Sequence, residues 1–357
     1  MKIAVAMSGG VDSSVAAALL KKDGHEVIGV TMLLHSPSGQ NNNVKPLLPD
    51  TVADARKVAV KLNIPHHVID LRDDFDRIVI TDFCREYSRG RTPNPCVLCN
   101  RDIKFGKLWE KAKELGAGYL ATGHYARIVK DKNSGKFLLK KGRDKLKDQS
   151  YFLCRLTQEQ LGHTLFPLGG MTKVEVRQIA KEMDLPAAAR PESQEICFIK
   201  GDDYAAFLKE HLQQEIKPGP ILDSPGNILG KHRGIPFYTI GQRKGLGIAT
   251  KNSLYVTAID TERNAIIVGI KEETYSDGLA ADNINWISGE WPELPVKMKA
   301  AIRYRHPGVE AIVNSGDKTV VSVKFAEPQA AVTPGQTVVF YDGDTVTGGG
   351  TIIKQGR

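Results

Sequence analysis

The sequence lacks several patterns that would assign it at once to a common class. The order G-x-x-x-x-G-K-[ST] occurs nowhere, which excludes the phosphate loop of kinases and GTPases. No apolar run approaches the roughly 20 residues needed to span a bilayer, so we expect no membrane partner. An apolar run begins at the N-terminus without a signal or transit peptide, and we therefore expect a cytoplasmic chain.

Cysteine is scarce, and its number is odd. Five cysteines in a chain without a leader argue against a framework of structural disulfides. Cys96 and Cys99 form a single C-x-x-C pair, and the second pair that a zinc ribbon normally has is missing, so structural zinc is the weaker interpretation. Inert packing suits Cys84 and Cys154 better than the others. The remaining interpretation is a sulfur-handling pair, Cys99 with Cys197.

The length and composition are those of a globular protein with two or three domains: 357 residues, 41% hydrophobic and 25% charged. Strand-like and helix-like runs alternate in the first half. The strand-like runs are 2–7, 27–32, 66–70 and 118–122, and the helix-like runs are 12–22, 51–62, 103–115 and 172–183. This alternation predicts an α/β fold with a parallel sheet, helices on both faces and a ligand at the carboxyl ends of the strands.

The pattern changes near residue 201, where one more helix is expected over 202–214. Short β-type runs with Gly and Pro follow: 220–222, 236–240, 254–259, 265–268, 297–304, 309–314, 318–325, 337–341 and 350–353. We therefore expect a catalytic domain over 1–203, a small, mostly β central domain over 204–273, and a β-barrel over 274–357. A polar loop is expected over 36–50.

The most informative segment is residues 3–14, IAVAMSGGVDSS. The apolar strand ends before Gly9 and Gly10, and a helical pattern follows. The backbone N–H groups of this turn and the positive end of the helix dipole are then placed to bind an anion. Serine hydroxyls add donors, and Asp12 can hold a Mg²⁺ ion that bridges phosphates. The string S-G-G-x-D-S-S resembles the signature of the PP-loop ATP pyrophosphatases.

Positive charge is concentrated in one segment. The net charge is +8, and residues 127–147 contain nine Lys or Arg against two Asp. A solvated lysine-rich hairpin explains this charge as well as a polyanionic partner such as RNA does.

Two further segments surround cysteines: GRTPNPCVLCNRDIKF (90–105) and PESQEICFI (191–199). We expect Asn100 or Asp102 to cap a following helix, which puts Cys99 near a helix N-terminus. The helix dipole and nearby Arg and Lys then lower the thiol pKa, and the flanking Pro, Asn and Arg argue against burial of Cys96 and Cys99.

Six motifs occur in order along the chain: SGGVDSS, GRTPNPCVLCNRxIKF, ATGHYAR, DQSYFL, SQEICFI and GQRKGLG. Together they resemble the tRNA-specific 2-thiouridylases, PP-loop enzymes that replace the C2 oxygen of the wobble uridine (U34) with sulfur. The resemblance implies ATP-dependent adenylation of that oxygen, followed by transfer of sulfur from a cysteine persulfide. It also implies tRNA partners with Lys, Glu or Gln anticodons, and a sulfur donor such as a cysteine desulfurase or a sulfur-relay protein.

The resemblance also implies roles for individual residues. Cys197 corresponds to the persulfide carrier and Cys99 to its attacker, which leaves a Cys99–Cys197 disulfide to be reduced. ATP contacts are implied for Ala6, Met7, Ser8, Gly9, Gly10, Val11, Asp12, Ser13, Met32 and Gly123. tRNA contacts are implied or plausible for Asn94, Pro95, Cys96, His124, Lys147, Asp148, Gln149, Arg303, Tyr304 and Gln336. For His124, a hydrogen-bonded loop histidine is the alternative.

The sequence departs from this family at Cys96, where many relatives have Asp. Cys96, Cys99 and Cys197 are then also candidate ligands of a [4Fe–4S] cluster that transfers sulfide. A different class also stays open, an ATP-dependent amidoligase acting on a small molecule. The basic segment and the paired cysteine loops favour the thiolase.

Overall fold

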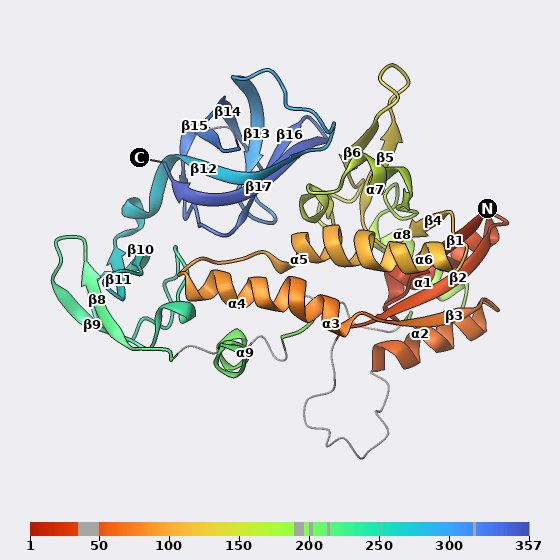
Figure 1. Ribbon diagram of the computed structural model, residues 1–357, viewed down its shortest axis with the longest axis horizontal. Helices are drawn as coiled ribbons and strands as arrows, with labels where there is room; N and C mark the ends of the chain where they lie inside the picture. Colours follow the sequence, from red (N-terminus) through yellow and green to blue (C-terminus); the bar gives the residue numbers. More distant parts are fainter. Residues whose placement is uncertain are drawn as a thin grey trace, which may run out of the picture.

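The computed structural model describes residues 1–34, 50–188, 196–199, 203–212, 215–250, 252–316 and 319–356. The expected polar loop, apart from Asp50, and residues 191–195 of the second cysteine segment lie outside the described residues. Figure 1 shows a helical and sheet-containing part at the N-terminal end of the colour scale, and two β parts at the other end.

The N-terminal part is built on a parallel sheet with the strand order β3-β2-β1-β4-β7. The strands are β1 (Lys2–Ala6), β2 (Glu26–Leu33), β3 (His66–Asp70), β4 (Tyr119–Ala121) and β7 (Thr164–Leu165). Ile3, Ala4 and Val5 of the central strand are fully buried, which explains its continuous apolar run. The first four strands confirm the predicted runs.

Helices cover both faces of this sheet, as expected. Ile3 and Val5 pack with α1 (Val11–Lys22), α2 (Asp50–Lys61) and α8 (Lys173–Glu182). Ala4 faces the other layer, where a helix runs from Pro95 to Glu114 through α5 (Pro95–Leu98), the wider π-type turns of η2 (Cys99–Leu108) and α6 (Trp109–Glu114). α3 (Arg72–Phe75), η1 (Asp76–Ile80) and α4 (Thr81–Ser88) form a second helix beside it (Figure 1).

Two of the helix predictions need correction. The helix expected over 103–115 begins eight residues earlier, because Pro95 fits the first helical position, where a missing N–H costs nothing. The helix over 72–88 was not predicted at all. The capping box of Thr172 and Glu175 at the start of α8 is confirmed.

The central part is a four-stranded mixed sheet with the order β10-β11-β8-β9. Its elements are β8 (Gly219–Asp223), β9 (Ile228–His232), β10 (Tyr255–Asp260) and β11 (Ala265–Gly269), preceded by α9 (Tyr204–His211). The strand predicted over 236–240 is wrong. Gly234 has a φ of +133°, and the 3₁₀ turn Ile235–Phe237 follows it.

The C-terminal part is a closed antiparallel barrel. Its strands are β12 (Tyr275–Trp286), β13 (Val296–Ala301), β14 (Val309–Ser315), β15 (Val321–Ala330), β16 (Thr337–Asp342) and β17 (Thr345–Gln355), with η6 (Lys271–Thr274) before them. β12 pairs with both β15 and β17, which closes the barrel. Side chains from all six strands fill its interior.

The basic segment forms a hairpin, β5 (Ala126–Lys130) and β6 (Phe137–Lys141), that joins this barrel. Leu139 and Lys140 pair with the start of β17. The carboxylate of Asp344 binds Arg127 at 2.7 Å and Lys140 at 3.0 Å. Part of the positive charge expected to attract RNA therefore holds the N-terminal part and the barrel together.

The remaining short helices are η3 (Ser150–Leu153) and α7 (Gln158–Gly162). No helix within the described ranges is long and apolar enough to cross a membrane.

Candidate active site

The glycine turn lies between β1 and α1, at the carboxyl edge of the parallel sheet. Gly9 has a φ of +71°, a conformation that favours glycine, and Gly10 caps α1 without a side chain. The Ser14 hydroxyl donates to the Gly10 carbonyl at 2.8 Å, and the Ser13 hydroxyl accepts from the Ser8 N–H at 3.2 Å. The serines shape the loop, and the start of α1 faces the space beyond the sheet edge.

The residues expected to bind ATP come together at this edge. Ala6 ends β1, Met32 lies near the end of β2, and Gly123 follows β4, and these three strands are neighbours. Met7 and Val11 are buried, and the Met7 backbone bonds β2, its N–H donating to the Val30 carbonyl at 2.8 Å and its carbonyl accepting from the Thr31 hydroxyl at 2.7 Å.

Asp12 forms an ion pair that the sequence reasoning missed. Both of its carboxylate oxygens accept from the Lys173 ammonium at 2.7 Å, and Oδ1 also accepts from the Tyr125 hydroxyl at 2.8 Å. The Lys173 side chain is only 10% exposed. Lys173 is the first residue of α8, where the helix dipole disfavours a cation. A lysine at this position of a predicted helix indicates that its ammonium has an anionic partner.

The same carboxylate is the candidate Mg²⁺ ligand. Within the described ranges, no group of three or more His, Cys, Asp or Glu side chains is placed to hold a metal ion. Magnesium commonly binds one or two carboxylates together with substrate phosphates, so Asp12 fits such a site only with ATP phosphates as the other ligands.

Gly123 is in close contact with the start of α1. A Cβ built at residue 123 meets the Asp12 backbone and the Ser13 nitrogen at 2.8 Å. We therefore expect Gly123→Ala to displace the N-terminus of α1 and to raise the ATP concentration for half-maximal pyrophosphate release roughly ten- to a hundredfold. Gly170→Ala is the matched control, because nothing lies within 4 Å of its Cβ position. Equal ATP dependence in the two variants would contradict this role.

The first cysteine segment is arranged differently from the expectation. Asn94, not Asn100 or Asp102, is the N-cap of the helix, Cys96 lies exposed in its first turn, and Cys99 follows one turn later. Cys99 is buried, so the expectation that its flanking residues prevent burial is wrong. Burial raises the pKa of the Cys99 thiol to about 12 and outweighs the attraction of the Lys104 ammonium. The prediction that the Cys99 thiol has a lowered pKa and is a thiolate in the resting protein is therefore wrong.

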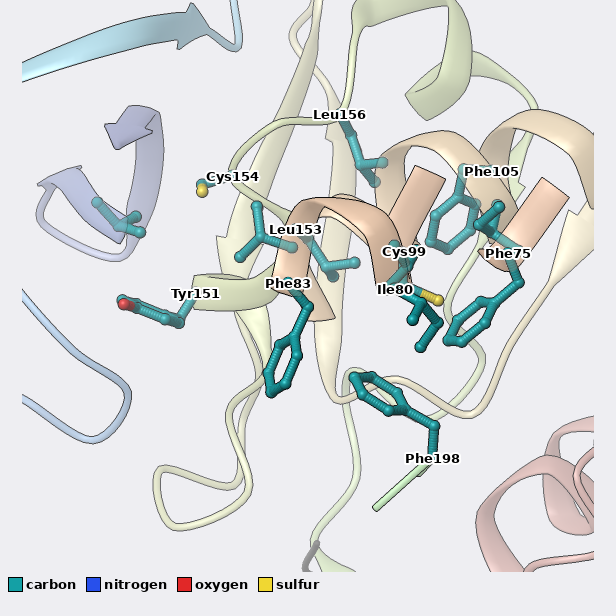
Figure 2. Packing of buried hydrophobic residues seen from close by; sticks show 14 of the residues in the cluster. Phe75, Ile80, Phe83, Cys99, Phe105, Tyr151, Leu153, Cys154, Leu156 and Phe198 are labelled. Carbon is teal, nitrogen blue, oxygen red and sulfur yellow. The ribbon is translucent and has the colours of Figure 1, made fainter. Parts of the chain in front are cut away.

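The second cysteine segment lies against the first. Cys197 is exposed, and its neighbour Phe198 inserts into the core, with ring centroids 5.7 Å from Phe75 and 5.2 Å from Phe83. Figure 2 shows the Cys99 sulfur among Phe75, Ile80 and Phe198. Cys197 and Cys96 both lie close enough to Cys99 that a negative charge on either thiol raises the Cys99 pKa.

The iron–sulfur alternative stays a prediction, because a cluster spaces its cysteine ligands farther apart than a single metal ion does. Within the part of the chain that the structure describes, Cys96, Cys99 and Cys197 do not form a group placed to hold a metal ion. Cys99 is buried while the other two face solvent. The other cysteines fit inert packing, because burial raises the pKa of Cys84 to about 11 and that of Cys154 to about 12.

The residues expected to contact tRNA form two groups. Near the helix start, the Gln336 amide of the barrel donates to the carbonyls of Thr92 at 2.9 Å and Pro93 at 3.2 Å, and the Tyr304 ring lies 4.5 Å from that of Phe152. Gln336 thus holds the chain that leads into Asn94, Pro95 and Cys96. Arg303, next to Tyr304, donates to the Ala330 carbonyl at 3.2 Å.

The second group lies beside Tyr125, after the basic hairpin. The Gln149 amide oxygen accepts from the Tyr125 N–H at 3.1 Å, and Asp148 accepts from the Gly142 N–H at 2.9 Å. Lys147 precedes them in the turn. His124 is buried, and its Nδ1 lies 2.6 Å from the Thr122 hydroxyl, which favours the alternative of a hydrogen-bonded histidine.

Comparison with known proteins covers the whole chain. Residues 1–201 match the family described as the tRNA methyl transferase HUP domain, residues 205–270 the corresponding PRC-barrel domain, and residues 276–352 an aminomethyltransferase beta-barrel domain. Among solved structures, a 4-thiouridine synthetase complexed with RNA and ATP is 17% identical over 58% of this chain and 50% of that chain, with a TM-score of 0.35.

Curated relatives match from end to end. The tRNA-specific 2-thiouridylase MnmA of Moorella thermoacetica is 54% identical over 98% of both chains. MnmA 1 of Caldanaerobacter subterraneus is 52% identical over 100% of this chain and 99% of its own. MnmA 2 of Thermoanaerobacter sp. is 51% identical over 99% and 98%. At this identity and coverage, with the glycine turn and both cysteine segments in place, the chain belongs to the family of tRNA-specific 2-thiouridylases.

Proposed function

We propose that this protein is an ATP-dependent tRNA-uridine 2-sulfurtransferase that thiolates the wobble uridine. The observation that carries the proposal is the position of Cys197 beside Cys99: its neighbour Phe198 packs on Phe75 and Phe83 of the adjacent helix and lies near the Cys99 sulfur (Figure 2). A small-molecule amidoligase has no need of two cysteine loops packed together. The full-length relatives named tRNA-specific 2-thiouridylases support the same conclusion.

In the activation step, the turn at 8–13 receives the phosphates of ATP. The uridine C2 oxygen attacks the α-phosphorus, the bond to the β-phosphate oxygen breaks, and pyrophosphate leaves. Lys173 places an ammonium group beside the N-terminus of α1, where it stabilises negative charge on the phosphates. Mg²⁺ held by Asp12 and the phosphates would neutralise further charge on the leaving group.

In the sulfur step, Cys197 carries the incoming sulfur as a persulfide. Cys99 attacks the sulfur bonded to Cys197, the persulfide S–S bond breaks, and a Cys99–Cys197 disulfide forms while hydrosulfide is released. The hydrosulfide attacks C2 and displaces AMP. Two external thiol groups then supply two electrons, become a disulfide themselves and restore both cysteines. Because Cys99 is buried and its thiol pKa is high, the reaction requires a local rearrangement that brings the Cys99 and Cys197 sulfurs into contact.

In this proposal tRNA lies across the catalytic part and the barrel. The target base reaches Asn94, Pro95 and Cys96, with Arg303, Tyr304 and Gln336 on the barrel side and Lys147, Asp148 and Gln149 on the hairpin side. A base must leave its stack to expose the C2 edge. tRNAs with Lys, Glu or Gln anticodons are the proposed substrates, and a cysteine desulfurase or relay protein the proposed donor.

Pyrophosphate release tests this function. We expect the purified protein to release pyrophosphate from ATP only with a substrate tRNA, and to form 2-thiouridine when a persulfide donor and a thiol are added. Release that is independent of tRNA but stimulated by a carboxylic acid and an amine donor would support the amidoligase instead.

A further inference from the structure

A cavity of about 320 Å³ lies along the helix that bears Cys96 and Cys99. From this helix Asn94, Val97, Leu98 and Arg101 line it, spaced as one face of a helix. α4 lines a second wall, and β12, β16 and β17 of the barrel line a third. The Cys99 sulfur faces Phe75 and Phe198 instead (Figure 2), so this cavity is separate from the sulfur chemistry.

One guanidinium in the cavity wall has no carboxylate partner. Arg155 is 9% exposed, its Nη2 donates to the Thr351 hydroxyl at 2.5 Å, and its Nε is buried without a hydrogen-bond partner. Within the described ranges no carboxylate lies within 4 Å of it, although Asp282 also lines the cavity. Burial lowers the pKa of Arg155, and the charge of Arg101 lowers it further.

The other arginines of the cavity are already paired. Arg91 lies 2.8 Å and Arg89 3.9 Å from Glu86, Arg101 lies 2.7 Å from Asp102, and Arg85 pairs with Asp82. A buried charge without a partner is costly, and an arginine that keeps donors free is suited to binding an anion with several oxygens. Nε of Arg155 is fully buried, so the donor that an anion in the cavity would reach is Nη1, for which the described residues supply no hydrogen-bond partner. This open donor points to a missing anion.

We propose that this cavity binds a phosphodiester group of the tRNA backbone, next to the nucleotide that enters at Asn94. The inference rests on the proposed function. Pro93 and Asn94 line the cavity and also lead into Cys96, so a chain whose base reaches the cysteines has its backbone within reach of Arg155. A phosphate there would also bridge the catalytic part and the barrel, because Thr351 belongs to β17.

The experiment measures tRNA affinity against salt concentration. We expect Arg155→Met to lower the slope of log K against log salt by about one unit, because one phosphate contact is lost. Arg155→Lys keeps the charge and should keep the slope. Arg263→Gln is the matched control, because Arg263 is 78% exposed on the central sheet and its loss should leave the slope unchanged. Arg155→Gln, which keeps an amide donor for the Thr351 hydroxyl but carries no charge, should lower the slope as Arg155→Met does and serves if Arg155→Met fails to fold.

A folded Arg155→Met with the slope of the unsubstituted protein overturns the proposal and leaves Arg155 a structural residue. Calorimetry measures the binding of inorganic phosphate to the same variants. If Arg155→Met abolishes phosphate binding but leaves the tRNA slope unchanged, the cavity binds a free anion and not the tRNA backbone. Failure of the unsubstituted protein to form 2-thiouridine refutes the proposed function itself, whereas normal thiolation with an unchanged Arg155→Met slope refutes only this inference.

Discussion

Cys99→Ser and Cys197→Ser are each expected to reduce 2-thiouridine formation at least about a thousandfold, to the background of the assay. A serine hydroxyl at residue 197 cannot carry a persulfide, and at residue 99 it cannot attack one. The glycine turn is untouched by either change, so tRNA-dependent pyrophosphate release should persist. The measurement is 2-thiouridine and pyrophosphate per enzyme in the same anaerobic reaction.

Two other cysteines provide the controls. Cys154→Ser tests for general damage, since Cys154 is buried away from Cys99 (Figure 2) and its thiol pKa is about 12. Cys96→Asp introduces the residue that many relatives have, and we expect it to keep activity. Loss of thiolation in Cys96→Asp together with loss of bound iron would contradict the persulfide route and support the cluster.

Asp12→Ala is expected to abolish tRNA-dependent pyrophosphate release, by roughly a hundredfold or more, with tRNA affinity unchanged. The change removes the candidate Mg²⁺ ligand and also the carboxylate that pairs with the Lys173 ammonium, whose side chain is 10% exposed. Because the Asp12 side chain is about a third exposed, we expect a loss of roughly 1–3 kcal/mol in the free energy of unfolding. Pyrophosphate release, tRNA binding and thermal unfolding of the same preparation separate these effects.

Lys173→Met is the companion variant, since it removes the other half of the pair. It should lose pyrophosphate release as Asp12→Ala does, while Asp12→Asn separates loss of charge from loss of the side chain. Full thiolation by Asp12→Ala would remove the argument for phosphate binding at the glycine turn.

Local pattern was enough to predict the catalytic architecture. The run from Ile3 to Val5 is apolar because helices cover both faces of the central strand, and a continuous apolar run is the signature of such a strand. The Ser8–Gly10 break marks the strand–helix turn for the same local reason, since Gly9 needs a positive φ. The alternation of strand and helix then places Gly9, Met32 and Gly123 at one sheet edge.

Pairing between distant segments was beyond the sequence. The position of Lys173 at the start of a helix indicates that its charge has a partner, but nothing in the sequence identifies that partner as Asp12, 161 residues away. Likewise, nothing near Lys140 indicates its pairing with Asp344, 204 residues away. β12 was not predicted because Ser, Asp and Asn interrupt its apolar residues, and its pairing with two partner strands stabilises it instead.

What the sequence determined by itself is the set of reactive groups and their order, because residue type and short spacing define a glycine turn, two cysteine loops and a basic segment. What the tertiary structure decided is their environment. Cys99 is buried because the helix begins at Pro95 and Phe198 packs beside its sulfur, so its pKa rises instead of falling. Arg155 is left without a carboxylate because the barrel closes over it. Desolvation and pairing depend on what packs against a group, and such neighbours come from elsewhere in the chain.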